Sequence, residues 1–481
     1  MNPIKIDSTY ILLSILLLTA CKERKQTISA QNPDLEYRID SIGAKFVDDG
    51  KVMGFSIAIV KKDSVLYNNS FGYVDSLQQI PATNNHYFLM ASISKLVGST
   101  IVMKLVEEGT LDLDDSLSFL LPDYPNQAQG EKIKLRHLIS MTSGLKEYAS
   151  TIDSVYVATG KSPTKDDYYE FFSGNELEFE PGSHYKYVNS GFVLMAMIVE
   201  RATKKSFQSN IDRIINKPTG FDIQLISKRM KSPLMSRHFQ LNDGKISRRK
   251  HWPWIKGDGG MTNTALQLAR FPNQWMNGSI ISQNSFKLMS SMTYLSSGYY
   301  SEYGFGVKNG DFEGEPMFGH SGGDATTYSM MFHFPRISTT IVTMVNTNRT
   351  PANARQMFSE VALIALEKKK PDYAKNEVIE GNLTDFVGGY LTPGDSADRT
   401  AYIVQDKESK GLYYTFDKNP KKGERMYNLG NGVFWIEKWP YDRLRFERDS
   451  AYNVVALKEF YGGYMSRIRP KVIGRNDEYI E

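Results

Sequence analysis

The stretch that decides the fold reads Ser92-Ile93-Ser94-Lys95, and it stands at the start of a helix that the sequence predicts over residues 90–108. Apolar side chains cover most of the circumference of this helix, which indicates that it is buried. Gly109 ends it, as glycine often does at a helix C-terminus. Two residues three positions apart lie on one helix face, with Cβ atoms roughly 5–6 Å apart. We therefore expect Ser92 and Lys95 to meet at the start of a buried helix.

The chemistry open to this pair is nucleophilic catalysis. A serine hydroxyl is a weak nucleophile until a base removes its proton. Lysine can be that base only when its pKa is lowered, and burial lowers it because desolvation disfavours the ammonium form. The N-terminus of a helix also favours developing negative charge. Ser-x-x-Lys alone is short enough to occur by chance, so other residues have to decide whether Ser92 is a nucleophile.

A second element is Tyr187-Val188-Asn189, just before a helix predicted over residues 191–204. A tyrosine near a lysine ammonium loses its proton more easily and can act as acid or base. The Asn189 amide can orient the lysine and a substrate carbonyl. Taken alone, the same residues are better interpreted as a turn in which Asn189 or Ser190 caps the helix.

A third element is His320-Ser321-Gly322-Gly323, which precedes two strands predicted as an antiparallel pair over residues 326–334 and 339–345. The backbone of this element would form one wall of a cleft. Two adjacent glycines let a substrate approach the main chain closely. Backbone N–H groups at this wall could form half of an oxyanion hole, although a plain glycine turn has the same sequence.

In this order, the three elements resemble the Ser-x-x-Lys, Tyr-x-Asn and Lys/His-x-Gly motifs of the class C β-lactamases, DD-peptidases, penicillin-binding proteins and related esterases. Similar stretches are residues 135–145 (LRHLISMTSGL), 257–264 (GDGGMTNT) and 303–306 (YGFG). The resemblance covers residues 35–365. It implies an α+β, β-lactamase/transpeptidase-like fold with two lobes. Helices flank an antiparallel sheet, a mostly helical lobe is inserted, and the active site lies between the lobes.

The resemblance also implies roles for individual residues. Ser92 would be the acylated nucleophile, Lys95 would activate it, and Tyr187 would exchange protons with the leaving group and the deacylating water. The backbone N–H groups of Ser92 and Gly323 would hold the oxyanion. The residues expected to bind and position the substrate are Asn189, His320, Ser321, Gly322 and Gly323.

His320 departs from many members of this family, which carry lysine at that position. Histidine is largely neutral at neutral pH, so it is a weaker partner for a substrate carboxylate. We therefore expect a serine hydrolase acting on an ester or a peptide amide, similar to an esterase or a D-Ala peptidase, with weak or no β-lactamase activity. The alternatives are a β-lactamase, or a non-catalytic binding or sensor protein with a penicillin-binding-protein-like fold.

Gly319-His320-Ser321-Gly322-Gly323 also matches Gly-x-Ser-x-Gly, the nucleophile elbow of α/β-hydrolases. That fold needs an acid and then a histidine later in the chain, and His333 is the only histidine after Ser321. A strand-like run follows Ser321 where the elbow requires a helix. Ser92 is therefore the better candidate nucleophile.

The N-terminus has the order of a secretory signal, with Lys5, an apolar run over residues 10–18 and small residues before Cys21. The apolar run is too short to span a bilayer. Leu18-Thr19-Ala20-Cys21 resembles the bacterial lipobox, in which the cysteine is diacylated. We expect a signal peptide over residues 1–20 and a lipidated tether over 21–33, which would anchor an exported protein to a bacterial membrane.

The length of 481 residues exceeds one ordinary core and favours more than one domain. We expect the hydrolase domain over residues 34–370 and an all-β barrel or sandwich over 384–481, where short aromatic segments alternate with Gly, Asn, Asp and Pro. A net charge of +4 gives no case for nucleic acid. The seven histidines lack metal-ligand spacing, so we expect no metal and no cofactor. The expected partners are a small-molecule or peptide substrate and the membrane.

Overall fold

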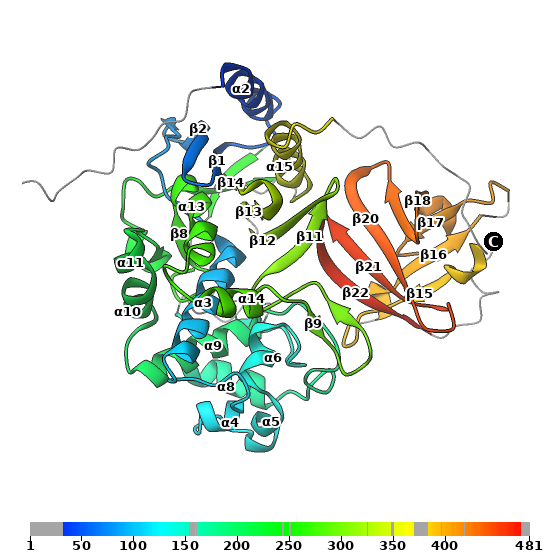
Figure 1. Ribbon diagram of the computed structural model, residues 1–481, viewed down its shortest axis with the longest axis horizontal. Helices are drawn as coiled ribbons and strands as arrows, with labels where there is room; N and C mark the ends of the chain where they lie inside the picture. The colour runs from blue at the N-terminus through cyan, green and yellow to red at the C-terminus, as the bar shows by residue number, and fades with distance from the viewer. Residues whose placement is uncertain are drawn as a thin grey trace, which may run out of the picture.

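The computed structural model describes residues 32–149, 151–152, 159, 161–242, 245–249, 252–324, 326–347, 351–369, 383–395, 397–406, 408–417 and 419–472. An antiparallel sheet with the order β11-β12-β13-β14-β1-β2-β3 is its central feature (Figure 1). The strands are β1 (Gly54–Lys61), β2 (Ser64–Asp75), β3 (Ile80–Pro81), β11 (Lys308–Phe312), β12 (Glu315–Gly323), β13 (Tyr328–Phe334) and β14 (Thr339–Val345). The predicted pair over 326–334 and 339–345 is confirmed as the hairpin β13–β14.

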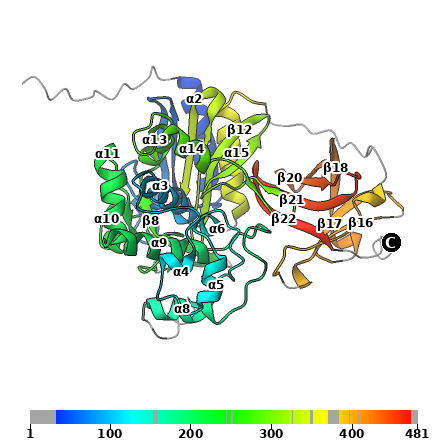
Figure 2. The same cartoon turned by 60° about the horizontal axis from the view of Figure 1, so that its bottom comes forward.

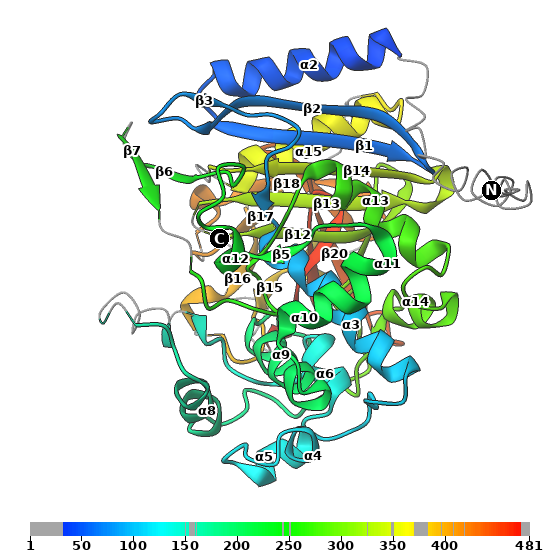
Figure 3. The ribbon, with the colours of Figure 1, turned by 90° about the vertical axis from the view of Figure 1, so that its left-hand side faces the viewer.

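Helices cover both faces of this sheet, which is why β14 is buried along its whole length. On one face lie α2 (Pro33–Asp48) and α15 (Pro351–Ala365), and Figure 3 shows α2 running above β1 and β2. On the other face α13 (Ala265–Met276) packs against β1 and β14. The side chain of Asn32 caps α2 and Pro33 occupies its first turn, so the last residues of the predicted tether begin a helix. Cys21 and the predicted signal lie outside the described residues.

A helical lobe lies below the sheet in Figure 2 and is built from residues between β4 and β11. Its helices are α3 (Ser94–Glu107), α4 (Leu117–Leu120), α5 (Gln127–Lys132), α6 (Leu135–Ile139), α8 (Lys165–Ser173), α9 (Ser190–Thr203), α10 (Phe207–Ile211), α11 (Lys217–Thr219), α12 (Ile226–Arg229) and α14 (Gln283–Met289). A π-helical turn, η2 (Asp212–Asn216), links α10 to α11. As predicted, α3 is buried over almost its whole length. Within the described ranges, no helix is long and apolar enough to cross a bilayer.

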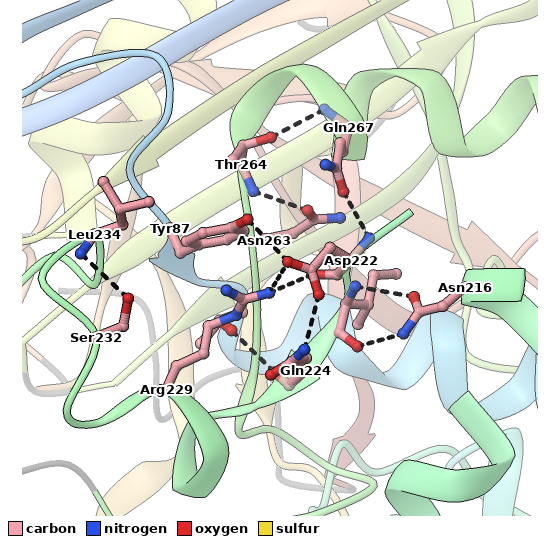
Figure 4. Close-up of polar contacts among 12 residues, drawn as sticks. Tyr87, Asn216, Asp222, Gln224, Arg229, Ser232, Leu234, Asn263, Thr264 and Gln267 are labelled. Carbon is pink, nitrogen blue, oxygen red and sulfur yellow. Dashed lines mark hydrogen bonds and ion pairs between the residues drawn. The ribbon is translucent and has the colours of Figure 1, made fainter. Parts of the chain in front are cut away.

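A three-stranded sheet, β4 (Phe88–Leu89), β8 (Met261–Asn263) and β5 (Gln224–Leu225), ties this lobe to the turn that carries Ser92. Polar side chains hold it together (Figure 4). Tyr87 donates a hydrogen bond to Asp222 (2.9 Å), and Arg229 forms an ion pair with Asp222 (2.6 Å). The Arg229 guanidinium also stacks on the Tyr87 ring, 3.4 Å from its centroid. Because β4 ends at Leu89, this cluster fixes the chain just before the nucleophile turn.

The C-terminal residues form a closed antiparallel barrel, with the strand order β15 to β22 and a further pairing between β15 and β22. The sequence had left barrel and sandwich open. The strands are β15 (Gly388–Tyr390), β16 (Ala401–Gln405), β17 (Leu412–Thr415), β18 (Glu424–Gly430), β19 (Val433–Ile436), β20 (Trp439–Arg448), β21 (Val454–Tyr461) and β22 (Tyr464–Val472). The fold class predicted from the sequence is therefore confirmed, including the additional all-β region.

The barrel is joined to the hydrolase sheet through β22, which pairs with β11 at Gly310 and Tyr464. A Cβ added at Gly310 would lie 2.0 Å from the Gly463 carbonyl oxygen, so glycine is what lets the two strands meet. Met465 and Ile468 of β22 are buried in the same hydrophobic cluster as α3. The barrel therefore shares a core with the hydrolase region, and β22 runs along the edge of the site described below.

The remaining strands form two small ribbons at the periphery. They are β6 (His238–Asn242) with β7 (Lys245–Arg249), and β9 (Thr293–Tyr294) with β10 (Tyr300–Ser301).

Candidate active site

Ser92 lies in a single 3-10 turn, η1 (Ala91–Ile93), and α3 begins at Ser94. The sequence predicted one continuous helix from residue 90. The difference arises at Ala91, whose φ of 45° lies in the left-handed region and cannot continue a right-handed helix. Such strain at a single residue is a feature of functional turns. The predicted meeting of the two side chains nevertheless occurs, because Lys95 Nζ donates to Ser92 Oγ at 2.9 Å.

Lys95 is completely buried, and its ammonium group is held by three acceptors. Besides Ser92 Oγ, they are Asn189 Oδ1 at 2.8 Å and the backbone carbonyl of Asp258 at 2.6 Å. Burial lowers the pKa of Lys95 to about 8, although the negative charges of Asp258 and Glu147 act in the opposite direction. Lys95 can therefore lose a proton close to neutral pH, which a base for Ser92 has to do.

Two acidic residues behind Lys95 were not singled out from the sequence. Glu147 Oε2 accepts hydrogen bonds from the Asn189 backbone N–H (2.7 Å) and from Asn189 Nδ2 (3.2 Å), which turns Asn189 Oδ1 towards the lysine. Burial raises the pKa of the Asp258 carboxyl to about 6, while Tyr148 donates to its Oδ2 at 2.9 Å. Asp258 belongs to the family-like stretch 257–264, whereas nothing in the sequence distinguished Glu147.

Tyr187 lies beside both members of the pair. Its ring centroid is 5.2 Å from Lys95 Nζ, and its hydroxyl shares a hydrogen bond with Ser92. Burial raises the pKa of Tyr187 well above its usual value, and this outweighs the hydrogen bond to Ser92. The sequence had suggested that a nearby ammonium group would ease loss of this proton. In the free protein Tyr187 is instead a neutral phenol, which suits it to donate a proton.

The wall formed by β12 touches the nucleophile turn directly. A Cβ added at Gly322 would lie 2.2 Å from the Met90 carbonyl oxygen and 2.7 Å from the backbone nitrogen of Ser92. Only glycine, which has no Cβ, lets β12 come this close to the nucleophile turn. It places Gly323 beside Ser92 in the lining of one cleft. Two backbone N–H groups in such a position are the components of an oxyanion hole.

His320 occupies a different place from the one expected for a substrate-binding side chain. It is fully buried, its Nε2 lies 3.0 Å from the Tyr303 hydroxyl, and its Nδ1 lies 2.5 Å from the Ser321 carbonyl oxygen. Burial lowers the pKa of His320 well below its usual value, and the charges of Lys308 and Lys95 lower it further. His320 is therefore a neutral residue that supports the wall from behind.

Lys308 supplies a cation to this wall, and the sequence analysis missed it. It stands opposite Gly319 in the β11–β12 pairing, and its Nζ donates to Ser321 Oγ at 3.1 Å. The ammonium group lies between the rings of Tyr187 and Tyr464, 5.2 Å and 4.2 Å from their centroids. Burial lowers the pKa of Lys308 to about 7, and the charge of Lys95 contributes. A bound carboxylate would favour its charged form.

These residues open onto a cleft of about 810 Å³. Ser92, Tyr187, Lys308, Ser321 and Gly323 line it, together with residues of β22. Lys95, His320 and Gly322 are buried, and Asn189 is half-buried beside Lys95. Because Ser321 lies within β12 and the next described element is strand β13, it does not form the strand-to-helix elbow of an α/β-hydrolase. Among the described residues, no cluster of three or more His, Cys, Asp or Glu side chains could hold a metal.

Comparisons with known proteins show the family and the fold of the chain. Residues 39–366 match the Beta-lactamase family. Penicillin-binding protein 4* of Bacillus subtilis (strain 168) is 25% identical over 439 residues, which cover 86% of this chain and 90% of that protein. Protein flp of Staphylococcus aureus (strain NCTC 8325 / PS 47) is 30% identical over 187 residues, which cover 38% of this chain and 37% of that protein.

Two solved structures share the fold. An octameric penicillin-binding protein homologue from Pyrococcus abyssi has a TM-score of 0.63 at 20% identity, with 90% of this chain and 99% of that chain covered. A D-amino acid amidase from Ochrobactrum anthropi SV3, complexed with L-phenylalanine amide, has a TM-score of 0.60 at 22% identity, with 69% and 99% covered. Because the family match spans residues 39–366, well over half of the chain, this protein belongs to the β-lactamase family of serine hydrolases.

Proposed function

We propose that this protein hydrolyses a peptide amide or an ester through an acyl-enzyme on Ser92, and that its substrate carries a free carboxylate next to the scissile bond. The observation that carries the proposal is the ammonium group of Lys308, 3.1 Å from Ser321 Oγ in the cleft that Ser92 also lines. A penicillin-binding protein and a D-amino acid amidase among the similar proteins support an amide substrate.

The proposed acylation begins when Lys95, in its neutral form, takes the proton of Ser92. Ser92 Oγ then attacks the substrate carbonyl, and the N–H groups of Ser92 and Gly323 stabilise the oxyanion. When the tetrahedral intermediate collapses, the Tyr187 phenol gives its proton to the leaving amine or alcohol. The Lys95 ammonium can return a proton to Tyr187, so Lys95 and Tyr187 regain their starting protonation states. The proton of Ser92 has left with the amine or alcohol, and Ser92 carries the ester.

Deacylation uses the same groups in reverse order. A water enters after the leaving group departs, and Lys95, neutral again, accepts its proton as the water attacks the ester. The ester bond to Ser92 Oγ breaks, and the serine recovers its proton from the same relay. Every group in this relay lies within the geometry given above for Ser92, Lys95 and Tyr187.

The Lys308 ammonium and the Ser321 hydroxyl would hold the substrate carboxylate by charge-assisted hydrogen bonds. The sequence analysis had taken neutral His320 as a weak partner for a substrate carboxylate. Lys308 supplies the cation that His320 does not, so the argument against carboxylate substrates is weaker. The same cation also favours a second candidate activity, β-lactam hydrolysis, because β-lactams present a carboxylate beside the reactive amide. Weak β-lactamase activity remains part of the proposal, and the experiment below measures it directly.

The test compares an N-acylated D-Ala-D-Ala peptide with the same peptide amidated at its C-terminus, alongside nitrocefin and a short-chain p-nitrophenyl ester. Lys308→Met should lower kcat/KM for the free-acid peptide about 10- to 100-fold, since hydrogen bonds to charged groups contribute about 1.5–3 kcal/mol. The amidated peptide and the ester should change little. Lys146→Met is the matched control, because Lys146 lines the same cleft but donates to Asn175.

Three outcomes would contradict parts of this proposal. An equal fall in kcat/KM for the free-acid peptide and for the amidated peptide would contradict a carboxylate-binding role for Lys308. Turnover of nitrocefin faster than that of the peptide and the ester would make the protein a β-lactamase. Absence of turnover of every substrate, in protein whose Ser92 no probe can label, would favour the non-catalytic sensor.

We also propose that Cys21 is lipidated and that the protein is exported to a bacterial membrane surface, where cell-wall peptides are met.

A further inference from the structure

We propose that Arg399 and Arg467 form a second anion-binding subsite, on the barrel side of the cleft, which takes an acidic side chain of a peptide substrate. This inference rests on the function proposed above and narrows its substrate class. The expected substrate is a peptide with two anionic groups, one at the terminus held by Lys308 and one further along the chain. The barrel would then select the substrate.

The first argument is continuity of the cleft. Arg399 and Arg467 line the same cavity of about 810 Å³ as Ser92 and Lys308. Arg467 belongs to β22, which pairs with β11, the strand that begins with Lys308. The positive charge of Arg467 also acts to lower the pKa of Tyr185, a buried residue that lines the same cleft. Arg467 and Tyr185 thus lie in the lining of one cleft, close enough for the charge of one to act on the other.

The second argument is charge. Both arginines are exposed, and across the described ranges no carboxylate lies within ion-pair distance of either side chain. The neighbouring cation Lys186 is different, because Glu178 (2.9 Å) and Asp395 (3.1 Å) neutralise it. The positive charge of Arg399 and Arg467 is thus available to a ligand that enters the cleft.

The other charged groups of the lining are also engaged. Lys146 donates to Asn175 at 3.1 Å, and Glu147 accepts from Asn189 at 2.7 Å. Asp324 accepts from the backbone N–H groups of Thr326 and Thr327 at 2.6 Å and 2.9 Å. Because Asn175 is neutral, Lys146 keeps its charge. A ligand carboxylate in this cleft therefore meets Lys308 near the nucleophile, the arginine pair on the barrel, and Lys146.

The third argument is that the segment carrying Arg399 is held in place. Its backbone carbonyl accepts from Arg469 Nη1 at 2.8 Å, and Arg469 is completely buried in an ion pair with Glu459 at 2.7 Å. Asp395, which also lines the cleft, forms an ion pair with Lys186, the neighbour of Tyr187. A site whose backbone is already ordered loses less entropy when it binds a ligand.

Arginine also fits the proposed ligand chemically. Its planar guanidinium group presents two parallel N–H donors to the two oxygens of a carboxylate. Because both side chains are exposed, each ion pair is expected to strengthen binding only a few-fold, and added salt should screen it. The subsite should therefore discriminate among substrates without holding them tightly.

The test uses the full-length protein carrying Ser92→Ala, so that peptides bind without being cleaved. Two peptides, acetyl-Glu-D-Ala-D-Ala and acetyl-Gln-D-Ala-D-Ala, are titrated by calorimetry at low and at high salt. We expect the Glu peptide to bind about five- to tenfold more tightly at low salt, and the difference to shrink at high salt. Adding Arg399→Gln and Arg467→Gln together should abolish the difference, whereas Lys421→Gln, which removes an exposed barrel charge outside the cleft lining, should preserve it.

Equal affinity for the two peptides in the Ser92→Ala protein would overturn the subsite, and so would undetectable binding of both. A Glu preference that persists in the double arginine variant would overturn its assignment to Arg399 and Arg467. Circular dichroism of that variant confirms that it is folded. None of these readouts depends on turnover, so they are distinct from failure of the proposed hydrolase function, which shows as absence of Ser92 labelling in the parent protein.

Discussion

The ammonium group of Lys308 lies 4.2 Å from the ring centroid of Tyr464, which places a barrel residue directly over a cation of the candidate active site. Tyr464 also shares a hydrogen bond with Ser321, the hydroxyl to which Lys308 donates. The Tyr464 and Tyr328 hydroxyls lie 3.0 Å apart. Tyr464 is therefore a positioning residue for Lys308, and the barrel forms part of the site. The sequence analysis had assigned no site residue to this region.

Replacing Tyr464 should weaken binding of carboxylate substrates without affecting the chemical step. Tyr464→Leu removes the ring, and a cation–π contact contributes about 0.5–2 kcal/mol, so KM for a free-acid peptide should rise about three- to tenfold at unchanged kcat. Tyr464→Phe keeps the ring and should recover most of this loss. An equal rise of KM for the amidated peptide, or a fall in kcat alone, would contradict the positioning role.

The pH dependence should separate the two lysines. Lys95 must be neutral to activate Ser92, so acylation by a neutral ester should rise with pH through an apparent pKa of about 8. Lys308 must be charged to hold a carboxylate, so kcat/KM for a free-acid peptide should also fall as the pH rises above about 7. Stopped-flow rates with both substrates give the profiles, and the falling limb should disappear in Lys308→Met. A neutral-ester rate that decreases from pH 6 to 9 would rule out Lys95 as the base.

Local spacing was enough to predict the pairing of Ser92 with Lys95 and the helix that follows them, because both depend on residues close in the chain. The alternation of side chains along a strand explains why His320 was misjudged. Ser321 faces the cleft, whereas the adjacent His320 contacts Tyr303 behind it. Lys308 and Tyr464 depend on strand pairings between distant segments, β11 with β12 and β11 with β22, for which the sequence gives no local signal.

The barrel also shows that local sequence signals predict only part of the structure. Short aromatic segments were predicted across residues 384–481, and those rich in aromatic and β-branched residues form β16, β17, β19, β20 and β21. Strands β15, β18 and β22 give weaker sequence signals, because they contain Gly388 and Gly389, Asn428 and Pro470. One of them, β22, is the strand that closes the barrel and reaches the active site, so its contribution was visible only in the structure.

Gly322 should be essential for the geometry of the site. In Gly322→Ala the new methyl group would collide with the Met90 carbonyl and push β12 away from the Ser92 turn. A displacement of about 1 Å at reacting groups can cost about 100-fold, so Ser92 acylation should slow by roughly that factor. Gly411→Ala is the matched control, because Gly411 has no positive φ and its added Cβ would meet only side-chain atoms of Arg425 and Ser409, at 3.2 Å and 3.4 Å. Near-normal acylation in folded Gly322→Ala protein would contradict the contact.

The lipid anchor is tested apart from the fold, since Cys21 lies outside the described residues. We expect the native protein to partition with membranes and intact-mass analysis to show a diacylated N-terminal cysteine. Cys21→Ser should release the protein or leave its signal uncleaved. A mature protein with an unmodified Cys21 would refute the proposal.

The assignment of Ser92 as nucleophile is the central claim, and labelling with a fluorophosphonate followed by peptide mapping tests it most directly. The protein should carry a single adduct on Ser92, Ser92→Ala should carry none, and Ser321→Ala should retain most of the labelling. Thermal melting of each variant confirms that it is folded. An adduct on Ser321, or a folded protein in which no serine reacts, would contradict the account.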